Sequence, residues 1–256
     1  GLSALYDYTG DLRYLRAICR AADWLLAYQE DDGSWINFTT VGARTYHARV
    51  AWALLEAHVR SSDQRYETAA IRQLDWVVGQ QHENGWFRAT SLSDPLYPWT
   101  HLIGYTISGL IESSQLLGEK GYVYYQAANK ALEGIIFSCV RVILGKTPYL
   151  PATFGSRWDS LSRDACPTGE AQIAFYFLKV GLLEHRSDFI EYAENSIQSL
   201  KRIQRIHDCN NDRRGGIPGS YPLSGTYCPY MLINWGAKFF ADLTLLHITK
   251  DTNMRS

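Results

Sequence analysis

Apolar positions along the chain recur at the three- and four-residue spacing of amphipathic helices. In the first such stretch Leu15, Ile18, Ala22 and Leu25 fall on one helical face, and the pattern stops at the turn-forming residues before Ser34. No strand-like alternation of useful length interrupts the helical pattern. The sequence therefore predicts an all-α protein.

The helical stretches fall into consecutive pairs, each an outer helix followed by an inner one rich in small residues. The pairs are expected at residues 12–30 with 46–59, 65–81 with 100–117, 122–144 with 168–183, and 189–206 with 230–248. The loops inside the pairs are polar, rich in Gly and Pro, and longest at 145–167 and 208–229. Arrays of helical hairpins often collect such loops on one face, which is commonly the binding face.

An internal repeat supports this organisation, because most of residues 11–35 returns at 63–86. Asp11, Tyr14, Asp23-Trp24, Gln29 and Gly33 become Asp63, Tyr66, Asp75-Trp76, Gln81 and Gly85, each displaced by 52. Junctions between an apolar run and an acidic residue recur at spacings of 52, 56, 69 and 63, which predicts four full units in one domain. Residues 1–10 align with 109–118, so they are expected to be the helical tail of an inner helix with a missing start, as in a fragment of a longer protein.

Composition limits the classes of partner. The 256 residues are 46% hydrophobic and carry 25 basic and 26 acidic residues, a formal charge of −1, which gives no indication of a nucleic-acid or anionic-membrane surface. No apolar run approaches the length of a transmembrane segment. The five cysteines are an odd number without paired or metal-type spacing, which favours reduced thiols and a cytoplasmic location. A small-molecule or oligosaccharide ligand fits this balance.

Two turns carry a recognisable motif. Residues Gln29, Gly33 and Trp35 fit the form Q-x-x-x-G-x-W, Gln81 with Gly85-Trp86 is a near match, and Gln204 before Gly215 is a looser third. The chain thereby resembles the α/α-toroid superfamily of terpenoid cyclases, squalene/hopene cyclases and protein prenyltransferase β-subunits. The resemblance implies an α/α toroid of about four hairpins plus an N-terminal remnant. Similar toroids also carry polysaccharide lyases, glycosidases and uronyl epimerases, so the motif fixes no reaction.

The motif has a structural explanation. The Gln side chain can bond backbone groups at a helix end, while Gly makes the turn and Trp packs over it. Trp24 and Trp76 are likewise interpreted as packing residues, and truncation of Trp76 is expected to cost several kcal/mol, as for a large core residue.

The isoprenoid chemistries of the resemblance are poorly supported by the residues. A class II cyclase would need a D-x-D-D motif, which does not occur. The zinc of a prenyltransferase would need Asp-x-Cys and a distant His, whereas His207, Asp208 and Cys209 are adjacent. We expect no zinc there and no other cofactor.

Candidate chemistry lies in and just before the first turns of the inner helices, which a toroid directs into its central cavity. The candidate catalytic residues are His47, His101, Asp164, Glu170 and Tyr227. The candidate substrate-binding residues are Tyr46, Arg49, Trp99, Tyr105, Arg163, Gln172, Tyr230 and Asn234. Each alone can be explained by helix capping or ion pairing, so the hypothesis rests on convergence: His47, His101, Glu170 and Tyr230 are expected in one concave region.

The leading functional hypothesis is an enzyme acting on a carbohydrate polymer or glycoconjugate by lyase, epimerase or hydrolase chemistry. Two alternatives stay open: an isoprenoid cyclase or transferase whose catalytic part lies outside this sequence, and a non-catalytic helical-repeat module that binds a partner.

Overall fold

A computed structural model describes residues 1–92, 96–143, 149–160 and 162–255. The α-helices of this part are α1 (Leu2–Thr9), α2 (Leu12–Ala27), α3 (Ala48–Ser61), α4 (Gln64–Val78), α5 (Thr100–Leu117), α6 (Tyr122–Ile143), α7 (Pro167–Glu184), α8 (Ser187–Ile203) and α9 (Asn234–Thr249). Two 3-10 helices, η1 (Thr45–His47) and η2 (Gly118–Gly121), precede α3 and α6. Extended segments of the described residues pair only through isolated bridges, so the all-α prediction is confirmed.

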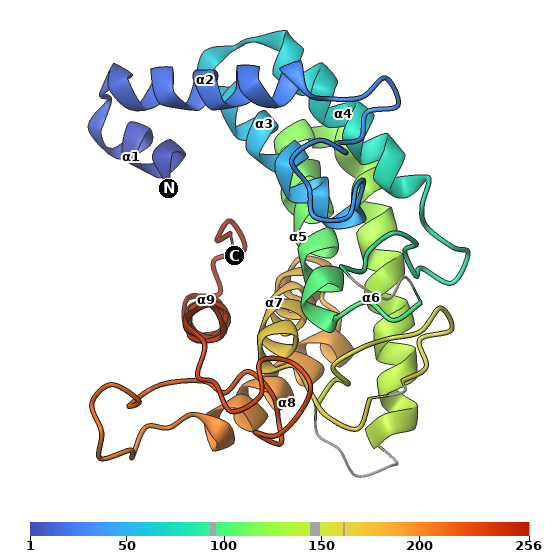
Figure 1. The fold of residues 1–256 in the computed structure, drawn as a ribbon, viewed down its shortest axis with the longest axis vertical. Coiled ribbons are helices and arrows are strands. Elements are labelled where there is room, and N and C mark those ends of the chain that lie inside the picture. Colours follow the sequence, from blue (N-terminus) through green and yellow to red (C-terminus); the bar gives the residue numbers. More distant parts are fainter. Residues whose placement is uncertain (93–95, 144–148, 161, 256) are drawn as a thin grey trace.

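The helices form two layers around an open ring (Figure 1). The inner layer is the series α3, α5, α7 and α9, in which each helix packs against the next. The outer layer is α2, α4, α6 and α8, and the short junctions connect each inner helix to the outer helix that follows it. α1–α2 and α9 lie at the two ends of the arc, and the C-terminal segment lies between them. This arrangement confirms the predicted α/α toroid.

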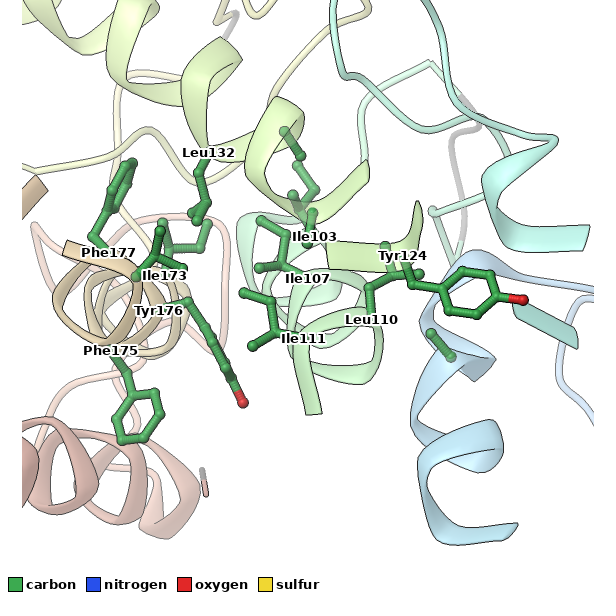
Figure 2. Packing of buried hydrophobic residues seen from close by; sticks show 14 of the residues in the cluster. Ile103, Ile107, Leu110, Ile111, Tyr124, Leu132, Ile173, Phe175, Tyr176 and Phe177 are labelled. Atoms are coloured by element: carbon green, nitrogen blue, oxygen red, sulfur yellow. The ribbon is translucent and has the colours of Figure 1, made fainter. Parts of the chain in front are cut away.

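Among the described helices, α5 and α7 are buried over most of their length. From Pro167 to Gly181 every residue of α7 is buried, as expected for a helix that neighbours surround on all sides. Figure 2 shows the isoleucines of α5 facing apolar side chains of α6 and α7. This packing fixes the inner helices on which the candidate chemistry lies.

The outer turns repeat the same hydrogen bonds. Gln29 Nε2 donates to the carbonyls of Gly33, at 2.9 Å, and Ala69, at 2.8 Å, and Gln81 makes the same pair of bonds to Gly85 and Ala127. Gln204 donates to Gly215 at 3.1 Å. The three glycines have φ of 90°, 89° and 83°, which is costly for other residues, and the motif's Trp35 and Trp86 are buried. The structural explanation of the motif is confirmed.

Contacts between outer helices also repeat. The hydroxyl of Tyr66 donates to Asp23 at 3.0 Å, and that of Tyr124 donates to Asp75 at 2.7 Å. Both tyrosines are the third residue of their outer helix, a position that Tyr14 and Phe189 hold in α2 and α8. Measured between these third residues, successive outer helices are 52, 58 and 65 residues apart. These values correct the repeat lengths of 52, 56 and 69 residues that the junctions indicated. The difference arises because the junctions themselves vary, as where η2 precedes α6.

Two further predictions about the N-terminal region have different outcomes. Residues 1–8 were expected to be helical, and α1 confirms this, lying on the inner side of α2 with Asp7 accepting a bond from Arg60 of α3 at 2.9 Å. Trp24 is 49% exposed and its ring packs against those of Tyr28 and Phe38, so its packing contacts lie at the surface and not in the core.

Trp76 at the repeat position of Trp24 is half-buried, and its indole is a hydrogen-bond partner of Asp32 in the preceding turn. The expected cost of truncating Trp76 stays a prediction.

Helix boundaries otherwise follow the sequence closely, with one larger shift. The last inner helix begins at Asn234 and not at 230, because Tyr230 has φ of 59° and its N–H donates to Leu223 within the preceding loop. The predicted end of the third outer helix at 144 lies outside the described residues. No described helix is long and apolar enough to cross a membrane.

Candidate functional site

The long loops meet at one end of the ring, beside the first turns of the inner helices. Thr45 N donates to Ala89 O at 3.1 Å, which joins the first loop to the second. Thr100 N donates to Ala152 O at 2.9 Å, and the backbones of Ala165 and Tyr221 exchange two bonds. The loops therefore form a connected layer on the face where the sequence predicted a binding site.

Below this layer, polar and aromatic side chains form stripes down the inner helices. The stripes are Arg49, Trp52 and Glu56 on α3; His101, Tyr105, Ser108 and Glu112 on α5; and Gln172, Tyr176 and Lys179 on α7. Members of each stripe are three or four residues apart, so they share one helical face. Contacts between the stripes link α3 to α5 and α5 to α7.

An aromatic cluster occupies the loop end of these stripes. The ring of Tyr227, from the last loop, lies 4.7 Å from that of His101 and 5.4 Å from that of Trp99, measured between centroids. The ring of Tyr105 is 6.0 Å from that of His101. Trp235 of α9 donates its indole N–H to the hydroxyl oxygen of Tyr227 at 3.1 Å. Residues of two inner helices, α5 and α9, and of the last loop thus form one cluster that includes His101.

The imidazole of His101 is buried without a full set of partners. It is 7% exposed, and Nδ1 has no hydrogen-bond partner among the described residues. Burial lowers the pKa of His101 to about 4, so the ring is neutral at pH 7 and able to accept a proton. Burial raises the pKa of the adjacent Tyr227, which keeps that hydroxyl protonated. A proton acceptor and a proton donor therefore lie side by side.

Arg49 connects this cluster to a cavity. Its guanidinium lies 5.0 Å from the Tyr105 ring centroid and 5.2 Å from that of Trp52, and Nη1 donates to Ser108 Oγ at 3.2 Å. Arg49 and Trp52 are in the wall of a cavity of about 650 Å³ between α1, α2, α3 and Arg255. A cation beside half-buried aromatic rings can hold a ligand carboxylate or hydroxyl groups.

The other end of the stripes is closed by buried charges. Lys179 and Glu112 are both fully buried and form an ion pair at 2.7 Å, and Tyr176 donates to the same carboxylate at 3.1 Å. Lys179 Nζ also donates to the carbonyl of Met254 at 3.1 Å, and Arg255 pairs with Glu56. These contacts fasten the C-terminal segment across the ring and give this end a structural role.

Glu170 does not join the cluster. One carboxylate oxygen accepts from the Leu150 N–H at 2.6 Å, and the other accepts from Tyr192, at 3.0 Å, and Ser196 of α8. It thus faces the outer layer, because a fully buried carboxylate needs several donors. Tyr230 is 74% exposed in the loop before α9. The prediction that these two residues share a concave region with His101 is wrong.

The other predicted residues are dispersed. Asp164 accepts from the N–H and hydroxyl of Thr226, at 2.6 and 2.8 Å, and so ties two loops together, while Arg163 and Asn234 are exposed. Gln172 is buried against Gly104, between α5 and α7, and its amide has no hydrogen-bond partner among the described residues.

His47 stacks edge-on against Tyr46 at the start of α3, with ring centroids 4.9 Å apart. Burial, followed by the charge of Arg44, lowers the pKa of His47 to about 4. The functional roles assigned to all these residues stay predictions.

Sequence reasoning missed Trp52, Glu112, Lys179 and Trp235. The available signal was the recurrence of polar or aromatic residues every three or four positions inside apolar inner helices. The predicted site covers only the expected first turns of these helices and the residues just before them, and Trp235 lies outside it because α9 begins at Asn234 and not at 230.

Comparison with known proteins finds likeness in structure alone. No family model matches the chain, and no curated protein matches it in sequence. An unsaturated glucuronyl hydrolase from Bacillus sp. GL1 is 15% identical with a TM-score of 0.73, over 98% of this chain and 72% of that one. A D-mannose isomerase is also 15% identical with a TM-score of 0.73, over 99% and 70% of the two chains. A glycosyl hydrolase family 88 protein from Bacteroides vulgatus is 13% identical, with a TM-score of 0.64 over 96% and 72%. At such identities the likeness establishes the shared fold.

Proposed function

We propose that the protein is a carbohydrate-active enzyme whose site is the cluster of Trp99, His101, Tyr105 and Tyr227 with Arg49. The observation that carries this proposal is the buried, neutral His101, whose Nδ1 lacks a partner and whose ring lies against that of Tyr227. A buried polar atom without a partner is costly in a folded protein, and a bound substrate offsets that cost.

The residue types suit sugar chemistry. Aromatic faces stack on the apolar faces of sugar rings, and Arg49 is placed to hold a carboxylate or hydroxyl groups. His101 removes a proton from a sugar carbon or from water, and the hydroxyl of Tyr227 gives a proton to the oxygen that leaves or becomes a hydroxyl group. The pair serves elimination, isomerisation and hydrolysis alike.

The structural neighbours support the substrate class. The Bacillus hydrolase is described as responsible for the degradation of glycosaminoglycan, and other neighbours are described as a polysaccharide lyase and a D-mannose isomerase. One neighbour is named together with the oligosaccharide dGlcA-Glc-Rha-Glc. The free state of Cys19, Cys166, Cys209 and Cys228 supports a cytoplasmic location.

The isoprenoid alternative gains no support from these neighbours. The sequence also lacks D-x-D-D, the acidic motif that a class II cyclase would need. The binding-module alternative predicts sugar binding without turnover, so the same experiment separates it from the proposal.

The test is turnover of a panel of sugars: unsaturated uronyl oligosaccharides, intact uronic-acid polysaccharides and free aldoses. Product analysis by mass spectrometry and NMR identifies hydrolysis, elimination or isomerisation. His101→Ala and Tyr227→Phe should each lower kcat about 10²–10⁴-fold. His207→Ala, at an exposed loop histidine, is the matched control and should keep full activity.

Equal losses of kcat in His207→Ala and in His101→Ala would contradict the assignment of His101 as a catalytic residue. Sugar binding that is unchanged in both variants, with no turnover of any panel member, would favour the binding module.

A further inference from the structure

Positive charge is concentrated at the turn that follows α8. Residues 201–214 contain five basic and two acidic residues, so this segment carries a formal charge of +3 in a chain whose total is −1. We call the basic residues Lys201, Arg202, Arg205, Arg213 and Arg214 the basic turn. The rest of the chain carries the balancing excess of negative charge, so this surface differs from its surroundings.

The basic turn has a defined shape. The carboxylate of Asp208 accepts bonds from Arg205 and Arg213, at 3.3 and 3.1 Å, and from the N–H of Asn210. Arg205 and Gly215 are joined through their backbones, and so are Arg205 and Gly216. Two of the five cations are thus used to hold the turn closed, which leaves the others to set its surface charge.

The remaining cations are available to an external ligand. Lys201, Arg202 and Arg214 are exposed, and none of them has an ion-pair partner among the described residues. Arg214 donates through Nε to the carbonyl of Asp208 at 3.1 Å, which still leaves its terminal nitrogens for another acceptor. Lys201 and Arg202 complement the dipole of the last turn of α8, whereas Arg214 has no such local reason.

We propose that the basic turn binds an anionic polysaccharide, one with sulfate or carboxylate groups on successive sugars. Several separate cations along one turn suit a ligand that repeats its charge, since each exposed pair contributes little alone. The turn belongs to the loop that carries Tyr227, and backbone bonds from Gly219 to Met231 and from Ile233 to Ile217 hold that loop together. The basic turn is thereby joined through this loop to the proposed site, and in this respect the inference rests on the proposed function.

The experiment measures binding of the whole chain to size-defined dextran sulfate and heparin fragments, with neutral dextran as reference, over a range of salt concentrations. The triple variant Lys201→Ser, Arg202→Ser, Arg214→Ser spares the two arginines that hold the turn. The matched control is Arg16→Ser, Arg20→Ser, Lys130→Ser, which removes the same charge from exposed positions on α2 and α6.

The basic-turn variant should bind the sulfated polymers at least about fivefold more weakly, with a shallower dependence on salt. The control should bind like the parent, and neutral dextran should not distinguish the proteins. Equal losses in both triple variants would overturn the proposal. Tighter binding of single-stranded DNA or of phosphatidylserine vesicles through the same three residues would also overturn it.

The experiments distinguish failure of polysaccharide binding at the basic turn from failure of the proposed function. His101→Ala should keep the full affinity for dextran sulfate, and the basic-turn variant should keep turnover of short oligosaccharides. Loss of dextran sulfate binding in His101→Ala would contradict a separate surface.

Discussion

The outer and inner layers of this ring use the same helical repeat in opposite ways. In the outer layer the repeat is kept: Gln29 and Gln81 make identical pairs of backbone bonds, and Tyr66 and Tyr124 donate to equivalent aspartates. In the inner layer equivalent faces differ from helix to helix, with arginine and tryptophan on α3, histidine and tyrosine on α5, and glutamine and lysine on α7. The layer that holds the hairpins together is repetitive, and the layer that faces the centre is not.

This difference separates stability from chemistry. A contact that recurs between successive hairpins stabilises each neighbouring pair by a similar amount, as in other repeat proteins. A side chain that occurs once can be placed for one task, as His101 is beside Tyr227. The buried pair Lys179–Glu112 shows, however, that a unique inner residue can also be structural.

The largest expected effect is at that inner ion pair. Lys179→Met leaves the Glu112 carboxylate buried without its hydrogen-bonded cation, with Arg255 Nε 3.7 Å away, and should lower the free energy of unfolding by about 3–5 kcal/mol. The double variant Lys179→Met, Glu112→Leu should recover most of this loss, because no unpaired charge remains. Urea denaturation of the three proteins measures both values. A double variant as unstable as the single one would show that the pair is not the cause.

The second largest effect is the loss of stability that His101 causes at acidic pH. Its pKa is lowered to about 4 in the folded protein, against about 6.5 when unfolded, so below pH 6.5 the unfolded chain binds a proton that the folded chain does not. Stability is therefore lost as the pH falls from 6.5 to 4, by about 2 kcal/mol at pH 5. His101→Phe should remove this part of the pH dependence. Denaturation curves at pH 7 and pH 5 measure this difference, and equal losses of stability in parent and variant would contradict the role of His101. His47→Phe tests the second buried imidazole in the same way.

The accuracy of the predictions made from the sequence also differs between the outer and the inner layer. The outer layer could be predicted because its residues recur: Gln29, Gly33 and their counterparts identified the turns, and the structure confirms the bonds they make. The inner layer could be predicted less well, because residues without counterparts offer no internal comparison. His101 and Tyr227 meet, whereas Glu170 turns towards α8.

Two errors have identifiable causes. A polar residue in the first turn of α7 can point to either neighbouring layer, and the requirement of the buried Glu170 carboxylate for several donors decided its direction. The start of α9 was placed too early because Tyr230 precedes a helical pattern, yet its backbone takes the left-handed conformation. Neither the donors nor that backbone angle is visible in periodicity.

The third effect compares two turns of the outer layer. Gln81→Ala removes bonds to both Gly85 and Ala127 and should cost about 1–3 kcal/mol. Gln204→Ala removes the bond to Gly215, the one side-chain hydrogen bond of Gln204 among the described residues, and should cost about 1 kcal/mol. Chemical denaturation of both variants measures the difference. Equal costs would mean that the bond between hairpins contributes nothing beyond the bond within the turn.

The smallest expected effect is at the contacts between outer helices. It tests whether these hydrogen bonds contribute to the stability of the ring. Tyr66→Phe removes a hydroxyl that donates to Asp23 and should cost about 1 kcal/mol. Tyr14 has the same place in α2, but its hydroxyl has no hydrogen-bond partner among the described residues, so Tyr14→Phe should change stability by less than about 0.5 kcal/mol. Each substitution removes one oxygen from the third residue of an outer helix, so helix propensity and apolar packing change alike, and the difference between the two costs isolates the bond. If Tyr14→Phe proves as costly as Tyr66→Phe, the hydroxyl acts within its own helix and the contact between hairpins is incidental.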